Sequence, residues 1–324
     1  MELVGIARNP VPNGAAPGSF ATRDGLNIRY ALWPRTADRR LGTVCLFGGR
    51  GEFIEKYFET ITDLRRRGFA VAMMDWRGQG GSDRLLKNPR KCHVEDFADF
   101  DKDLGQFMSE IVLPDCPAPF YGMAHSMGGH ILLRSALTKV CWFDRIILSA
   151  PMIDILPEFT KSTALRYLIE AQVLFGFGDR YVPGGKPQPF ELEPFEDSKL
   201  TSDPLRYDRV RDVLKAAPWL SCGSPTLGWL QAAARSIMQI NAFGFASSIK
   251  VPVLIVAAGN DTVVSTRAIE HFATQIKTGR HLVIAGAKHE ILQERDEIRD
   301  QFWAAFDVYV PGSNRTMSES HIGL

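Results

Sequence analysis

The sequence lacks several features that mark other classes of protein. Its 324 residues carry 38 Lys and Arg against 37 Asp and Glu. There is no basic excess of the kind that a nucleic-acid binder uses, so no nucleic-acid partner is expected. The N-terminus has no apolar core of a secretory signal, and no uncharged apolar run approaches the roughly 20 residues that span a bilayer. We therefore expect a cytoplasmic protein. Peripheral contact with the inner membrane stays open, and the sequence indicates no oligomeric state.

Cysteine is scarce and scattered. The five cysteines are widely spaced and form no C-x-x-C pair: Cys45, Cys92, Cys116, Cys141 and Cys222. This pattern is neither that of a disulfide framework nor that of a zinc site. We therefore expect a reducing compartment, no metal and no other cofactor.

Short apolar runs alternate with amphipathic stretches along most of the chain. We expect strands at 43–47, 69–74, 119–123, 145–149, 251–257 and 281–284, and helices at 55–67, 96–112, 127–137, 265–276 and 294–306. Such alternation predicts an α/β fold with a mostly parallel central sheet and helices on both faces.

One segment breaks this alternation. Residues 152–250 contain no apolar strand pattern but three helical ones, at 162–175, 205–217 and 226–240. We expect a helical cap here, inserted into a core formed by residues 18–151 and 251–310. A loose arm is expected at 1–17 and a flexible tail at 311–324. The first cap helix is apolar over most of its circumference, which suits either packing within the cap or the lining of an acyl-binding tunnel.

The strongest local motif is Y-G-M-A-H-S-M-G-G, residues 121–129. A strand ends, Ser126 stands between small residues, and a helix begins, which is the layout of a nucleophile elbow. The alternative is that Ser126 only caps a helix. A nucleophilic serine also needs two oxyanion donors. We expect them to be the N–H groups of Met127, the next residue, and of Arg50 in the glycine loop F-G-G-R-G-E.

A nucleophilic serine needs a base and a carboxylate that orients the base. His289 follows the last expected strand, at the sheet edge where ligands bind in open α/β folds. Asp261 follows the strand at 251–257, and Asp154 is the rival acid. Taken alone, His289 could be a surface histidine and Asp261 a turn residue. The loop D-W-R-G-Q-G-G-S, residues 75–82, is expected to border the site in a structural role.

Together these motifs resemble the α/β-hydrolase superfamily, and within it the bacterial lysophospholipase and monoacylglycerol lipase branch. The resemblance is carried by D-W-R-G-Q-G-G-S, A-H-S-M-G-G and G-A-K-H-E-I-L, in that order over residues 20–308. It implies the triad Ser126, Asp261 and His289, and the oxyanion donors Arg50 and Met127.

The resemblance also implies an activity. We expect a cofactor-independent serine ester hydrolase that forms an acyl-enzyme on a single-chain lipid ester, a lysophospholipid or a monoacylglycerol. The alternatives are a short-chain carboxylesterase or an aminopeptidase for small N-terminal residues. A non-catalytic binding protein on this fold is not favoured, because such proteins usually lose a triad member and all three candidates are present.

Overall fold

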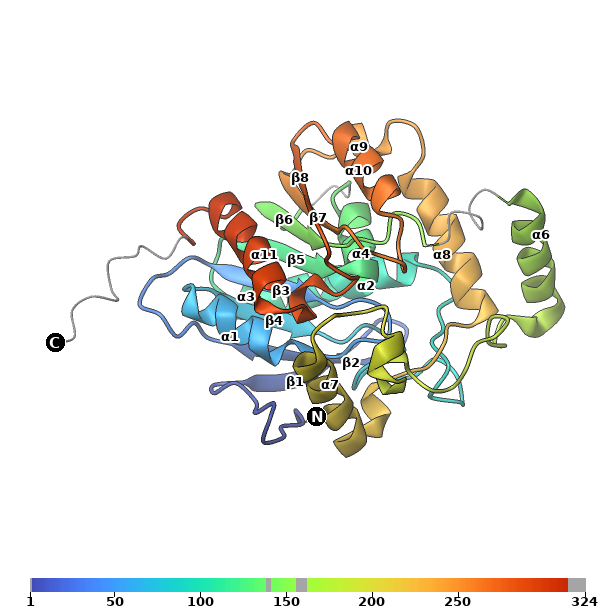
Figure 1. Ribbon diagram of the computed structural model, residues 1–324, viewed down its shortest axis with the longest axis horizontal. Helices are drawn as coiled ribbons and strands as arrows, with labels where there is room; N and C mark the ends of the chain where they lie inside the picture. The colour runs from blue at the N-terminus through green and yellow to red at the C-terminus, as the bar shows by residue number, and fades with distance from the viewer. Residues whose placement is uncertain (1, 138–140, 156–161, 314–324) are drawn as a thin grey trace.

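The computed structural model describes residues 2–137, 141–155 and 162–313. Its centre is an eight-stranded sheet in the order β1-β2-β4-β3-β5-β6-β7-β8 (Figure 1). The strands are β1 (Ala16–Ala21), β2 (Asn27–Trp33), β3 (Thr43–Phe47), β4 (Ala70–Met74), β5 (Phe120–His125), β6 (Arg145–Ser149), β7 (Val253–Ala258) and β8 (Gly279–Ile284). From β4 to β8 all neighbours are parallel, whereas β1–β2 and β2–β4 are antiparallel. The predicted α/β fold with a mostly parallel sheet is confirmed.

The parallel strands are the ones that the sequence predicts best. All residues of β3, β4 and β7 are buried, as expected for strands covered on both faces. The sequence did not predict β1 or β2. Pro17 and Gly18 give β1 the composition of a loop. This strand begins inside the segment that was expected to be a loose arm, and Asn9 of the same segment is buried and donates to the Glu55 carbonyl oxygen at 2.8 Å.

Helices cover both faces of the sheet. Outside the 152–250 segment they are α1 (Phe58–Arg66), α2 (Ala98–Phe107), α3 (Leu113–Asp115), α4 (Ser126–Ser135), α10 (Thr266–Gln275) and α11 (Asp296–Tyr309). The pair α1 and α11 lies in front of the sheet in Figure 1, with the Arg67 guanidinium 4.1 Å from the Trp303 ring centre. The pair α2 and α4 lies behind it, joined by the Arg134–Asp101 ion pair at 2.6 Å.

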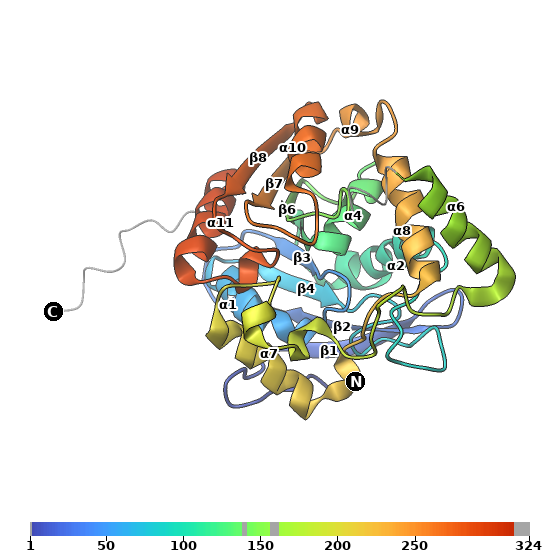
Figure 2. The ribbon, with the colours of Figure 1, turned by 45° about the vertical axis from the view of Figure 1, so that its right-hand side comes forward.

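The described residues between β6 and β7 include four α-helices and no strand of the central sheet. The helices are α6 (Thr163–Gln172), α7 (Pro204–Ala216), α8 (Leu227–Ile240) and the short α9 (Phe245–Ser248). In Figure 2 α6 lies beside α8, and α7 lies at the opposite side near α1. Side-chain caps fix the starts of the three longer helices: Ser162, Asp203 and Thr226 each accept a hydrogen bond from a first-turn N–H. Residues 314–324 of the expected tail lie outside the described residues.

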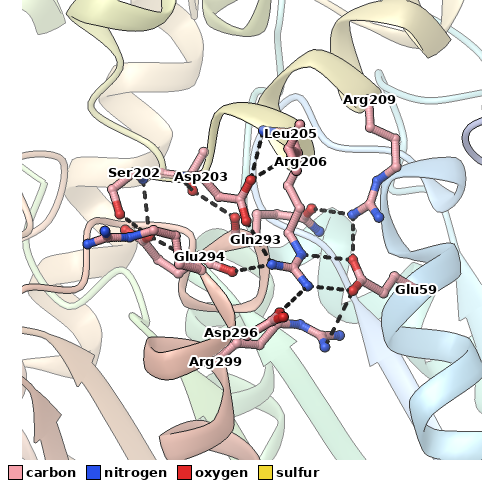
Figure 3. Close-up of polar contacts among 12 residues, drawn as sticks. Glu59, Ser202, Asp203, Leu205, Arg206, Arg209, Gln293, Glu294, Asp296 and Arg299 are labelled. Carbon is pink, nitrogen blue, oxygen red and sulfur yellow. Dashed lines mark hydrogen bonds and ion pairs between the residues drawn. The ribbon is translucent and has the colours of Figure 1, made fainter.

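One arginine ties α7 to the core (Figure 3). Arg206 donates to Glu59 of α1 at 2.6 and 2.9 Å and forms ion pairs with Asp203 at 2.8 Å and Asp296 at 2.7 Å. Burial alone would raise the pKa of Glu59, but the hydrogen bond from Arg206 and the charges of Arg299 and Arg209 outweigh it and lower this pKa to about 2. This part of the inserted segment is therefore fastened to α1 and α11.

The ion pairs around Glu59 make the free energy of unfolding depend on pH. The pKa of Glu59 falls from 4.5 to about 2 on folding, so its contribution is complete above about pH 4.5 and is lost as the pH falls through 2. Glu59→Gln should lower the free energy of unfolding at pH 7 by about 1.5–3 kcal/mol, the scale of hydrogen bonds to charged groups. Urea unfolding at pH 7, 4 and 2.5 measures this. The variant should lose less stability with acid than the wild type. The exposed Glu297→Gln is the control, and equal effects of the two variants would contradict the assignment.

The structure corrects the prediction for the cysteines. Cys92 and Cys222 form a disulfide, with Cα atoms 5.5 Å apart. Their spacing of 130 residues could not reveal this, because the contact depends on the fold. The backbone joins the same two segments: Gly223 N–H donates to the Arg90 carbonyl oxygen at 2.8 Å, and Thr226 N–H to the Cys92 carbonyl oxygen at 3.0 Å. The inference of a reducing compartment therefore loses its basis.

Within the part of the chain that the structure describes, no helix is both long enough and apolar enough to cross a bilayer.

Candidate active site

Ser126 stands at a strained turn between β5 and α4. Its φ is +50°, in the left-handed region that a non-glycine residue rarely adopts. The following glycines allow the chain to pass closely: a Cβ on Gly128 would lie 2.5 Å from the Gly48 carbonyl oxygen, and one on Gly129 3.0 Å from Pro151 Cβ. The small residues of the motif are thus required sterically, and the turn presents the serine at the carboxyl end of the sheet.

Ser126, His289 and Asp261 form one hydrogen-bonded relay. His289 Nε2 lies 3.0 Å from Ser126 Oγ, and His289 Nδ1 lies 2.7 Å from Asp261 Oδ2. The other carboxylate oxygen of Asp261 accepts the N–H groups of Val263 at 2.8 Å and Val264 at 3.0 Å. Burial would raise the pKa of Asp261, but the hydrogen bond from His289 and these N–H donors lower it. A carboxylate held ionised in this way can orient the imidazole and stabilise its protonated form.

Two neighbouring loops bring the histidine and the aspartate together. Strands β7 and β8 pair in parallel up to Ala258 and Ile284, so the loops that follow them leave the same edge of the sheet. Asn260 N–H donates to the Ala287 carbonyl oxygen at 2.8 Å and joins these loops beside the relay. Asp154, the rival acid, follows β6, and its carbonyl oxygen accepts from Ser265 N–H at 2.9 Å, whereas the hydrogen-bond partner of His289 Nδ1 is Asp261.

Side chains of the D-W-R-G-Q-G-G-S loop hold the glycine loop F-G-G-R-G-E that follows β3. Gln79 Nε2 donates to the Gly49 carbonyl oxygen at 2.7 Å, and Gln79 Oε1 accepts from Gly51 N–H at 3.0 Å. Trp76 Nε1 donates to the Gly48 carbonyl oxygen at 2.9 Å. The D-W-R-G-Q-G-G-S loop thus fixes the backbone next to Arg50. The sequence predicted a structural role for this loop, but its pattern did not indicate that Gln79 holds both sides of the turn.

The two expected oxyanion donors are the backbone N–H groups of Arg50 and Met127. Gly49 N–H is taken by Glu52 Oε2. Among the hydrogen bonds of the described residues, none engages the N–H of Arg50 or of Met127.

Beside the relay lies a buried ionic cluster that the sequence did not reveal. Lys56 Nζ contacts Glu290 at 2.6 Å, Glu52 at 3.0 Å and Glu191 at 3.3 Å. Burial would raise the pKa of Glu52, but Lys56, the nearby His125, and the hydrogen bonds from Tyr57 and Gly49 lower it to about 2. The i,i+4 spacing of Glu52 and Lys56 was the only sequence signal. Glu290 comes from the loop of His289 and Glu191 from the inserted segment, so that pairing depends on the fold.

Three donors of this region are close enough to share a metal ion: Glu52, His125 and Glu290. Lys56 already contacts both carboxylates, and His125 Nδ1 lies 3.1 Å from the Ser149 carbonyl oxygen. A cation bound there would have to displace the ammonium, so these residues are better explained as an ion cluster than as a metal site.

The relay opens into a cavity of about 760 Å³. Ser126 and His289 line it together with apolar side chains from the inserted segment, among them Leu165, Leu168, Ile169, Val182, Phe190, Leu227, Trp229 and Leu230. This volume is in the range of pockets that hold small organic ligands, roughly 300–1,000 Å³. The mostly apolar wall suits a hydrocarbon chain.

The fold and the relay define an α/β-hydrolase of the serine type. The chain belongs to the family described as serine aminopeptidase, S33, whose model matches residues 38–296. It is 33% identical over 290 residues to lysophospholipase L2 of Escherichia coli strain K12. The aligned region covers 86% of this chain and 83% of that protein. The chain is 27% identical over 274 residues to a probable lysophospholipase L2 of Haemophilus influenzae, covering 85% and 84%.

Solved structures share the fold. A soluble variant of monoglyceride lipase from Saccharomyces cerevisiae matches with a TM-score of 0.71 and 20% identity, over 94% of this chain and 97% of that one. A thermostable carboxyl esterase from Bacillus coagulans matches with a TM-score of 0.73 and 21% identity, over 93% and 99%. The family model and the two lysophospholipase L2 relatives confirm the resemblance to the lysophospholipase and monoacylglycerol lipase branch.

Proposed function

We propose that this protein hydrolyses the ester of a single-chain lipid through an acyl-enzyme on Ser126. The observation that carries the proposal is the relay from Asp261 through His289 to Ser126 at the wall of an apolar cavity. Ser126 Oγ attacks the ester carbonyl carbon while His289 Nε2 takes its proton. His289 then protonates the departing alcohol oxygen as the ester C–O bond breaks. In the second half, His289 takes a proton from water, whose oxygen attacks the acyl carbon. The bond between the acyl carbon and Ser126 Oγ then breaks, His289 returns the proton to Ser126 Oγ, and the fatty acid is released.

The negative charge that develops on the carbonyl oxygen needs fixed donors. We assign this role to the N–H groups of Arg50 and Met127, which carry no other acceptor among the described residues. A donor of this kind stabilises the transition state by about 2.7–4 kcal/mol. Gln79, Trp76 and Glu52 hold the loop that presents the first of them.

The substrate class follows from the cavity and the relatives. A cavity of about 760 Å³ with apolar side chains from α6 and α8 accommodates one acyl chain. The two relatives named as lysophospholipase L2 support a lysophospholipid, and the monoglyceride lipase fold neighbour supports a monoacylglycerol. The short-chain esterase and aminopeptidase alternatives are not favoured by these matches. We treat residues 152–250 as the cap that provides this wall.

A panel of purified substrates tests the substrate class. Esters of one headgroup with acyl chains from acetyl to stearoyl should show kcat/KM rising with chain length, because each buried methylene contributes about 0.8 kcal/mol. An aminoacyl amide should react poorly. A sharp optimum at acetyl or butyryl would reject the lipid assignment while leaving the serine mechanism intact.

We further propose peripheral membrane contact through α6 and the turn that follows it. This stretch exposes large apolar side chains next to the cavity: Tyr167 is 67% exposed, Leu168 56%, Leu174 84% and Phe175 75%. Exposed apolar groups clustered on one element are typical of a lipid or protein contact. Leu168 also lines the cavity, so a lipid held at this surface would lie close to the site.

Removing the two most exposed of these side chains should weaken vesicle binding. For Leu174→Ser with Phe175→Ser we expect a loss of about tenfold or more in the partition coefficient, since two side chains of this size contribute about 1.5–3 kcal/mol each when fully buried. Co-sedimentation with phospholipid vesicles measures it. The pair Val308→Ser with Leu113→Ser, exposed on other elements, is the control. Equal binding by both double variants and the wild type would reject this contact surface.

A further inference from the structure

Arg50 places a cation in the cavity wall without a carboxylate partner. One guanidinium nitrogen, Nη1, donates to the Gly223 carbonyl oxygen at 3.0 Å. The guanidinium carbon lies 5.9 Å from the ring centre of Phe190 and 5.8 Å from that of Trp229. No ion pair of Arg50 is found among the residues that the structure describes. Much of its hydrogen-bonding capacity is therefore left for a ligand, since a guanidinium carries five N–H donors.

The carboxylates nearest to this cation are engaged elsewhere. Glu52 and Glu191 contact Lys56 Nζ at 3.0 and 3.3 Å, and this single ammonium, which Glu290 also contacts at 2.6 Å, offsets part of their charge. Burial lowers the pKa of Arg50, and the charges of Glu191 and Glu52 only partly oppose that effect. A cation removed from water and left without a paired anion is costly. An anionic ligand group in this position would be stabilised by it.

The chemistry of the guanidinium selects the kind of anion. Its planar fork of donors matches the oxygens of a phosphate, which it can bind through two parallel hydrogen bonds. The cavity as a whole does not attract anions, because Glu193 and Asp197 also line it. Recognition of a phosphate here would therefore depend on direct contact with Arg50 rather than on the overall field.

The reach of the side chain fits one class of substrate. In arginine, a chain of covalent bonds leads from Cα to the guanidinium carbon. In an acylglycerophosphate, a chain of about the same number of bonds leads from the ester oxygen to the phosphorus. Arg50 N–H has been assigned to the ester carbonyl, so its side chain can follow the glycerol backbone of the same molecule. A monoacylglycerol has only a hydroxyl at the corresponding position.

We propose that the Arg50 guanidinium binds the headgroup phosphate of a lysophospholipid and so makes this substrate preferred over a monoacylglycerol with the same acyl chain. This inference rests on the proposed ester hydrolase function. It gives the residue two separate tasks, one for its backbone and one for its side chain. Substitution of the side chain alters the second task most directly, since every variant except proline keeps the N–H group.

The test compares two substrates that differ only in the headgroup. The kcat/KM values are measured for 1-palmitoyl-glycerophosphoethanolamine and for 1-palmitoylglycerol with the wild type, Arg50→Gln, Arg50→Lys and Lys199→Gln. Lys199 is the matched control, because it also lines the cavity but is exposed. Arg50→Gln should lower the ratio of the two values by about tenfold or more, the effect of one lost charged hydrogen-bonded contact. Arg50→Lys should be intermediate, and Lys199→Gln should keep the ratio.

Binding is measured separately with the 1-O-hexadecyl ether analogues of both substrates, which cannot be hydrolysed. Calorimetry should show that Arg50→Gln weakens the binding of the phosphate-bearing ether but not that of the other ether. Thermal unfolding shows whether each variant is folded. An unchanged ratio in Arg50→Gln, or an equal loss in Lys199→Gln, would overturn the proposal. If Arg50→Gln does not fold, a ratio in Arg50→Lys equal to that of the wild type would overturn it. Hydrolysis of neither substrate by the wild type would reject the proposed function, while the ether binding would still decide the role of Arg50.

Discussion

Ser126→Ala should lower kcat for ester hydrolysis by about 10⁶-fold. Ser126 Oγ is the atom that forms the acyl-enzyme, and it lies 3.0 Å from the imidazole nitrogen that accepts its proton. Loss of a nucleophile whose base is in place has an effect of this order in serine hydrolases, and the residual rate comes from the oxyanion donors and binding alone. Steady-state kinetics on a long-chain ester, with active-site titration to exclude traces of wild type, measure the change.

The control for this prediction is a second serine in the same cavity. Ser224 also lines the cavity, but its hydroxyl oxygen accepts a hydrogen bond from Lys186 N–H at 2.9 Å. Ser224→Ala should therefore stay within about tenfold of the wild type, as expected for a residue outside the relay. A Ser126→Ala protein that folds and retains more than a small fraction of its activity would contradict the mechanism.

Asp261→Asn should lower kcat by about 10⁴-fold with little change in KM. The carboxylate accepts a hydrogen bond from His289 Nδ1 at 2.7 Å and so leaves Nε2 free to take the serine proton. An asparagine amide can instead donate to Nδ1, which stabilises the wrong tautomer, and it cannot balance the charge of the imidazolium. Substrate binding should be nearly unchanged, because Asp261 is not among the residues that line the cavity.

Asp154→Asn is the matched control, because Asp154 was the rival acid in the sequence. Asp154 lies after β6, and its carbonyl oxygen accepts from Ser265 N–H, whereas the His289 imidazole meets Asp261. We expect a change below about tenfold in kcat. If Asp154→Asn were as damaging as Asp261→Asn, the assignment of the orienting acid would have to be revised.

The sequence predicted the parts of the molecule that depend on local pattern. Continuous apolar runs indicated β3, β4 and β7, since a strand covered on both faces has no polar side to alternate with. Ser126, His289 and Asp261 could be proposed because each follows a strand whose carboxyl end reaches the same edge of a parallel sheet.

Features that depend on tertiary contact could not be predicted in this way. The pairing of Cys92 with Cys222 and the cluster around Lys56 join segments that are far apart in the chain. The antiparallel strand β1 was missed because Pro17 and Gly18 outweigh its weak alternation, and its pairing with β2 forms the strand regardless. The role of Gln79 required the distances to Gly49 and Gly51.

The most direct test of the central claim is covalent labelling with a fluorophosphonate probe. Such a probe forms a stable bond only with a serine hydroxyl that a neighbouring base activates. The account predicts one labelled tryptic peptide carrying the probe on Ser126, slow labelling in Asp261→Asn, and none in Ser126→Ala. Folded, esterase-active protein with Ser126 unlabelled, or with the probe on another serine, would contradict it.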